Sequence, residues 1–191
     1  AERLMHIWDV PPIYYLAMIT LVKCELWLAQ GRTDLAEAWL TRLSQTYNGE
    51  HPAAPPEFHP QLPLHIELQQ ALLEVIQGQP MLAEGRLIAL LERGQQTGRQ
   101  LLSTMALTQI TSLLLSTGRE PEARKALGQA LEAAAGGVLQ PFDRLLAEHP
   151  DWLRGQLQLC APTTVCQDLA EKLPTPVVRP ALEPTAAAEQ L

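Results

Sequence analysis

Five histidines and three cysteines are the side chains of this chain that could ligate a metal or act as nucleophiles. The histidines are His6, His51, His59, His65 and His149, and the cysteines are Cys24, Cys160 and Cys166. The histidines show no i, i+4 pairing and no carboxylate–histidine motif, the patterns typical of zinc sites on helices. Cys160 and Cys166 are six residues apart and lack the Cys-x-x-Cys spacing of redox and zinc motifs. We therefore expect no metal and no cofactor.

Hydrolytic and phosphoryl-transfer motifs are also missing. The sequence contains no G-x-S-x-G turn and no GxxxxGK[ST] loop. Glu120 and Glu122 form a local pair of carboxylates, but they fall in the first turn of an expected helix. Negative charge at that position complements the positive end of the helix dipole. We therefore expect that this chain is not an enzyme.

A stripe of hydroxyl side chains is a candidate for ligand binding. Thr104, Thr108 and Ser112 recur every four residues, and this spacing places all three on one face of a helix. Such a stripe has two interpretations, a solvated helix surface or the lining of a binding groove. The choice depends on how the helices pack.

Three glycines in one sequence frame predict the elements that position these side chains. Gly31, Gly78 and Gly118 are each followed by a small residue after five positions and a leucine after nine. The small residues are Ala36, Ala83 and Ala123, and the leucines are Leu40, Leu87 and Leu127. The frame predicts a helix, a glycine turn and a second helix, repeated at spacings of 47 and 40 residues. We expect the three alanines to be buried where paired helices cross, because larger groups would not fit.

Prolines and glycines set the expected ends of the helices. The prolines within 48–61 remove backbone donors and exclude a helix, so this segment is expected to be a loop. The expected helices are 13–30, about 33–47, 62–77, 80 to about 93, 99–117 and 121 to about 133, followed by short helices at 141–148, 150–159 and about 164–172. The segment 94–98 is expected to connect the second pair to the third.

Stacked helical pairs cover one another's apolar faces and build a curved binding surface. The fold class that we predict is all-α, a right-handed superhelix of helical hairpins of the tetratricopeptide-like kind with a short helical cap. The domain is expected to span 1–172, and the proline-rich segment 173–191 is expected to be a linker.

The composition excludes several partners. The net charge is −7, with 14 Lys and Arg that are scattered along the sequence, so we expect no direct contact with nucleic acid. No run of eighteen apolar residues occurs, so we expect no membrane span. The chain opens without a signal-peptide pattern and its cysteines suggest no disulfide framework, so we expect a cytoplasmic fragment of a longer protein.

Two segments carry a resemblance to a known family. The first is LAQGRTDLAEAWLTRL, which has a similar second copy in TGREPEARKALGQAL, and the second is GGVLQPFDRLLAEHPDWLRGQL. They resemble the helical-repeat region of the large ATP-dependent, MalT-type activators of the LuxR family. The tail ending AAAEQL is similar to the linker that leads into their helix-turn-helix domain.

The resemblance implies a sensor or interaction domain of a transcriptional activator. It implies a nucleotide-binding module upstream and a DNA-binding module downstream, and either a small-molecule inducer or a regulatory protein as the partner. In stacks of this kind the first helix of each pair lines the concave face. The residues that would line it here are His65, Gln69, Gln70, Thr104, Thr108 and Ser112. The alternative is a general tetratricopeptide-like scaffold for protein–protein interactions outside transcription.

Overall fold

The computed structural model describes residues 12–134, 137–160 and 162–174, and within these residues the regular elements are all helical. Three antiparallel pairs come first: α2 (Pro12–Ala29) with α3 (Thr33–Tyr47), α4 (Leu62–Ile76) with α5 (Pro80–Gln96), and α6 (Gln100–Ser116) with α7 (Glu120–Ala133). A C-terminal cap follows, made of the 3-10 turn η1 (Gln140–Phe142), α8 (Asp143–Glu148), α9 (Pro150–Leu159) and α10 (Thr164–Lys172).

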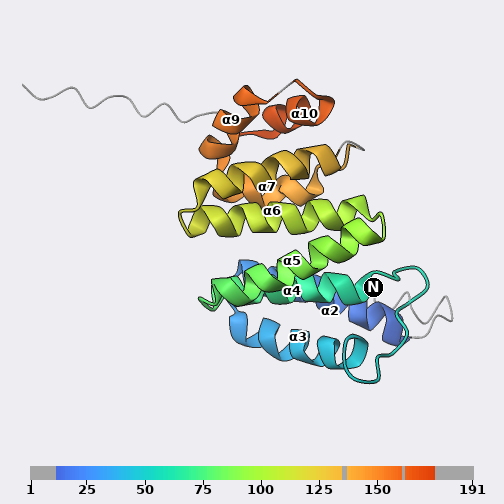
Figure 1. The fold of residues 1–191 in the computed structure, drawn as a ribbon. Helices are drawn as coiled ribbons and strands as arrows, with labels where there is room; N and C mark the ends of the chain where they lie inside the picture. The colour runs from blue at the N-terminus through green and yellow to red at the C-terminus, as the bar shows by residue number, and fades with distance from the viewer. Residues whose placement is uncertain (1–11, 135–136, 161, 175–191) are drawn as a thin grey trace, which may run out of the picture.

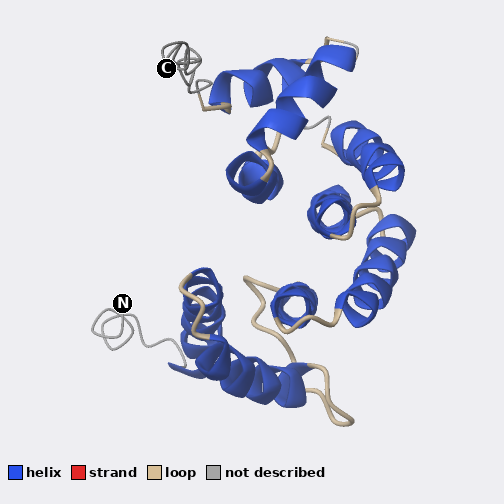
Figure 2. Ribbon diagram, turned by 90° about the vertical axis from the view of Figure 1, so that its left-hand side faces the viewer, coloured by secondary structure: helices blue, strands red, loops and turns tan. Residues whose placement is uncertain are grey.

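The helices pack in chain order along an arc (Figures 1 and 2). Each helix of the three pairs contacts the next one along the chain, and α2 also contacts α4. The first helices α2, α4 and α6 lie on the hollow side of the arc, together with α8, while α3, α5 and α7 lie on the outer side. The all-helical class that we predicted is confirmed for the described residues.

The turn within each pair is closed by a glycine in the left-handed region. Gly31, Gly78 and Gly118 have φ values of 72°, 75° and 75°, which only a residue without a Cβ adopts freely. In the first turn, the N–H of Arg32 donates to the carbonyl of Trp27 at 2.8 Å, and the N–H of Gly31 donates to that of Leu28 at 3.1 Å. These bonds satisfy helix-end carbonyls that would otherwise lack partners, in the manner of a Schellman turn.

A fourth glycine makes the same turn between pairs rather than within one. Gly98 has φ 63°, and the N–H of Arg99 donates to the carbonyl of Gly94 at 2.8 Å. We expected the second helix of this pair to end at 93, but α5 continues through Gly94 to Gln96. The missing side chain of Gly94 lets α6 approach closely, because a Cβ there would lie 2.6 Å from the Oγ of Ser103 on α6.

The core is divided into three clusters along the arc. The first joins α2, α3 and α4, the second joins α4 to α7, and the third joins α6 and α7 to the cap. Ala36, Ala83 and Ala123 are all fully buried, which confirms the burial expected for them. The segment 48–61 contains no helix, as its prolines predicted. Most of the expected linker, 175–191, and the first eleven residues lie outside the described part of the chain.

The buried alanine of the second pair provides a test of packing. Replacing Ala83 by Leu should lower the free energy of unfolding by about 1–3 kcal/mol, because the added methyl groups overfill a close helix crossing. Ala89 is exposed on the same helix, so Ala89→Leu is the matched control and should change stability little. Urea denaturation with an unchanged slope measures both, and equal midpoints for the two variants would contradict the close crossing.

Two glycines of the second pair should respond in opposite directions to the same substitution. Gly78→Ala should destabilise the domain by about 1–2 kcal/mol, because an L-residue is strained at φ 75°. Gly85 is helical in α5 with no atom within 4 Å of an added Cβ. Gly85→Ala should therefore stabilise by about 0.5–1 kcal/mol. Thermal denaturation of both variants checks this, and a shift of the same sign in both would refute the turn assignment.

Candidate functional site

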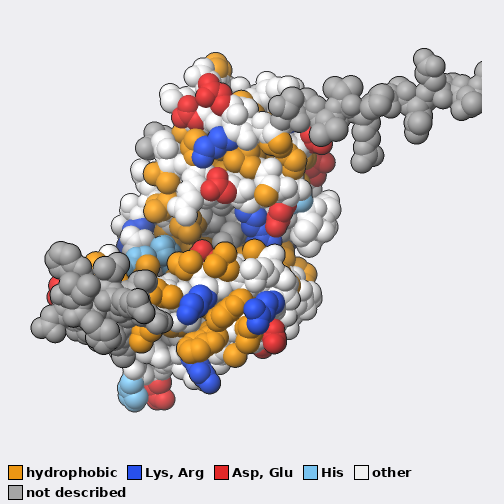
Figure 3. Space-filling view, turned by 180° about the vertical axis from the view of Figure 1, so that it is seen from behind, with side chains coloured by type: hydrophobic (Ala, Val, Ile, Leu, Met, Phe, Trp, Pro, Cys, Tyr) orange, Lys and Arg blue, Asp and Glu red, His pale blue; other side chains and the backbone are white. Residues whose placement is uncertain are grey.

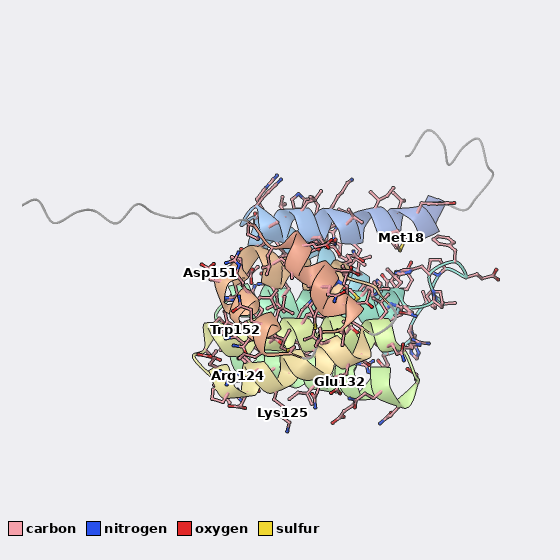
Figure 4. All side chains as sticks on the ribbon, turned by 90° about the horizontal axis from the view of Figure 1, so that it is seen from above. Met18, Arg124, Lys125, Glu132, Asp151 and Trp152 are labelled. Atoms are coloured by element: carbon pink, nitrogen blue, oxygen red, sulfur yellow. The ribbon has the colours of Figure 1, made fainter. Side chains whose placement is uncertain are left out.

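The hollow side of the arc is where the first helices expose polar side chains. Figure 3 looks onto this side and shows a depression between the two halves of the molecule, with histidine side chains beside it. Seen from above, Met18 projects from α2 toward the other helices, whereas Arg124 and Lys125 project from α7 on the opposite, outer side (Figure 4). The hollow side therefore presents a mixed polar and apolar surface.

Two of the six predicted ligand-binding residues lie together on α4. His65 and Gln69 are one helical turn apart, and Gln69 is buried. The Nε2 of Gln69 donates to Glu25 on α2 at 2.8 Å, which ties the first helices of two neighbouring pairs together. His65 packs against His59 of the 48–61 loop, with ring centroids 4.8 Å apart. We call Glu25, His59, His65 and Gln69 the junction cluster.

Three buried polar atoms of the junction cluster have no hydrogen-bond partner among the described protein atoms. They are the Nε2 atoms of His59 and His65 and the Oε1 of Gln69. An unpartnered buried donor or acceptor costs about 1–3 kcal/mol. The cluster is therefore an unfavourable arrangement for a purely structural core and a suitable one for a binding surface.

Burial also sets the charge of the junction cluster. Burial lowers the pKa of His65 to about 4, and the nearby His59 lowers it further by repulsion between the two protonated rings. Burial lowers the pKa of His59 as well and raises the pKa of Glu25. At neutral pH both imidazoles are uncharged, so each ring offers one donor and one acceptor nitrogen.

Gln70 lies on a different side of α4, facing α5. Its Oε1 accepts from Arg86 at 3.3 Å, and Arg86 forms an ion pair with Glu74 at 2.6 Å. A second pair between α4 and α5 joins Arg93 to Glu67. Gln70 therefore belongs to a polar network that holds the two helices of one pair together.

The hydroxyl stripe of α6 is buried, and its last member contacts the cap. Thr104 and Thr108 donate to carbonyls of their own helix at 2.9 and 3.0 Å, a common way to satisfy a hydroxyl inside a helical packing. Ser112 donates to the carboxylate of Glu148 on α8 at 2.8 Å. All three residues are buried, and Ser112 joins α6 to α8, so the stripe is part of the helix packing rather than an open surface.

Sequence reasoning missed Glu25 and His59 as members of the cluster. Glu25 meets Gln69 across 44 residues of sequence, a contact that no local pattern predicts. His59 was assigned only to a proline-rich loop, although the repeat spacing does show that this loop is an insertion next to α4.

A second concave feature lies in the cap. A pocket of about 380 Å³ opens between α7 and α10, lined largely by apolar atoms and by Cys160 and Cys166. Burial and the neighbouring Cys166 raise the pKa of the Cys160 thiol, which keeps it protonated and a weak nucleophile. Thr163 caps α10 by accepting from the N–H of Cys166 at 3.3 Å. The pocket therefore offers apolar volume rather than thiol chemistry.

Comparison of the chain with protein-family models, with curated proteins and with solved structures gave no match. The described residues hold no group of three or more His, Cys, Asp or Glu side chains that could bind a metal ion. No helix in the described part of the chain is long and apolar enough to cross a bilayer.

The lowered pKa of His65 predicts how stability depends on pH. Its folded pKa of about 4 lies below the ordinary value of 6.5, so the unfolded chain binds more protons between these values. Stability should therefore fall as the pH falls from about 6.5 to about 4. His65→Gln should flatten this slope, measured as urea midpoints across that range. His51→Gln, at an exposed loop position, is the control and should leave the slope unchanged. A slope unaffected by His65→Gln would show that His65 is not buried as described.

Proposed function

We propose that this chain is a helical-repeat binding domain whose junction cluster, on the hollow side of the arc, holds an inducer or a partner protein. The observation that carries the proposal is the set of unpartnered buried atoms on His59, His65 and Gln69. A ligand that supplies their missing hydrogen-bond partners would recover a cost that the free domain bears. Because the imidazoles are neutral at pH 7, the cluster suits uncharged hydrogen-bonding groups such as hydroxyls or amides.

The wider arrangement that we propose is a right-handed superhelix of stacked helical hairpins. Three pairs share one turn geometry and one pattern of buried alanines, and each packs on the next along an arc. Repetition of one unit with a constant rotation generates a superhelix with a concave face. The cap covers α6 and α7, as a terminal unit must if the last apolar face is to be shielded from water.

The biological role that we propose is that of the sensor region in a MalT-type activator of the LuxR family. The proposal rests on the resemblance of the turn segments and of the closing segment 136–157. In such a protein a nucleotide-binding module would precede this domain and a DNA-binding module would follow it in the cytoplasm. Ligand binding could affect those modules only if the ligand favours one conformation of the domain over another.

A thermal-shift screen of metabolites with Gln69 and Gln70 variants tests the proposed site. A ligand of the junction cluster should raise the melting temperature by mass action, in proportion to the logarithm of its concentration at saturation. Gln69→Ala should abolish the shift, whereas Gln70→Ala, on the α5 side of the same helix, should retain it. Shifts that persist in Gln69→Ala would place binding elsewhere, with the cap pocket as the next candidate. Duplex DNA should give no salt-sensitive shift, given the net charge of −7.

A further inference from the structure

Three apolar positions recur on the first helix of every pair. They lie sixteen, twelve and five residues before the turn glycine. In α4 they are Leu62, Ile66 and Leu73, and in α6 they are Leu102, Ala106 and Leu113. All six residues are buried, and each set shares a core cluster with the second helix of the preceding pair, α3 or α5. These positions are therefore the contact surface between one pair and the pair before it.

The same positions on α2 are less completely buried. They are Tyr15, which is 36% exposed and stacks on Phe58 of the 48–61 loop, Ile19, which is partly buried, and Leu26, which is 55% exposed. Leu16 and Val22 are also exposed and widen the apolar surface. Figure 3 shows hydrophobic side chains gathered on this part of the molecule, with Lys and Arg among them. We call these five residues the α2 stripe.

A polar contact accompanies each junction between pairs. Glu84 on α5 accepts from Arg119, directly after the next turn glycine, at 2.8 Å. Glu37 on α3 accepts from Gln77, directly before the next turn glycine, at 3.0 Å. Both carboxylates stand six residues after the glycine of their own pair. An acidic residue at this position therefore marks the second helix of the earlier pair.

The first pair has the donor side chains of this polar contact, but they have no carboxylate partner among the described residues. Gln30 and Arg32 flank Gly31 as Gln77 and Arg119 flank their glycines. Both are exposed, and neither side chain forms a hydrogen bond or ion pair with any described residue. An apolar stripe and an arginine with no partner among the described residues thus lie at the sites that are filled in the next two pairs.

The geometry points to the α2 stripe as a docking surface for the second helix of a further helical pair of the same kind. That helix would present a small residue five positions and a leucine nine positions after its turn glycine, against the stripe. It would present a carboxylate six positions after that glycine, within reach of Arg32 or Gln30. This surface is separate from the junction cluster and does not depend on the proposed function.

A second copy of this chain cannot provide such a helix in the same geometry. The matching faces of α3 and α5 are covered by α4 and α6. The face of α7 that carries Leu127 and Ala130 is covered by Phe142 and Leu145 of the cap. All three second helices in the described residues are therefore already occupied, and the docking helix must come from a different pair.

A fusion that supplies such a pair tests the inference. A second copy of residues 62–99 is joined directly to residue 13, so that α2 follows the added α5 in the register in which α6 follows α5. The added pair should protect the amides of α2 from hydrogen exchange relative to the unfused 191-residue chain. Leu26→Asp should lower the melting temperature of the fusion by about 5 °C or more, since it places a charge in the new apolar contact.

Leu82→Asp in the original part of the chain is the matched control, because Leu82 is 53% exposed but lies on α5 outside the stripe. Leu82→Asp should lower the melting temperatures of the fusion and of the unfused chain by the same small amount. Leu26→Asp should also lower the melting temperature of the unfused chain only slightly. Arg32→Glu should lower the melting temperature of the fusion, and Glu84→Arg in the added copy should restore it. Equal losses from Leu26→Asp and Leu82→Asp in the fusion would overturn the proposal. So would a large loss from Leu26→Asp in the unfused chain, which would show that the chain itself or a second copy already covers the stripe.

Discussion

The hydrogen-bonded glycine turn is the constraint on which the architecture depends. The backbone N–H of the third residue beyond each of these helices reaches back to a carbonyl of its last turn only when the residue just before it is left-handed. That geometry fixes the angle at which the next helix returns, and the return angle brings Ala36, Ala83 and Ala123 into the crossing. The turn at Gly98 extends the same constraint to the contact between pairs. Turn chemistry and alanine packing are therefore two parts of one interaction.

The helices could be predicted almost completely from the sequence because their ends depend on local chemistry. Pro80, Gly118 and the prolines of 48–61 act through their own backbones, and the expected bounds agree with the structure within a few residues. The end of α5, at Gln96, lies three residues beyond the end expected near 93. Gly94 is a helical residue that makes room for Ser103. Its role depends on a neighbouring helix, which a local pattern does not reveal.

The candidate site was less accessible to prediction because it is made by contacts between pairs. The spacing of Thr104, Thr108 and Ser112 correctly indicated one face of α6, but not that this face would be buried or that Ser112 would bond to Glu148 of α8. His65 and Gln69 were chosen as polar residues of a first helix, yet their significance comes from Glu25 and His59. Periodicity identifies the face on which a residue lies. It does not identify the neighbour that the face will meet.

The connection 48–61 has a consequence for how such a domain can evolve. It makes the first repeat seven residues longer than the second, yet Leu62 and Ile66 immediately after it are fully buried. The entropy of closing a loop rises only slowly with length, by about 0.6 kcal/mol for each doubling. Insertions at this place therefore cost little stability and leave the helix register intact. The same loop contributes His59 to the junction cluster, so variation in its length and composition can alter recognition while the scaffold is inherited unchanged.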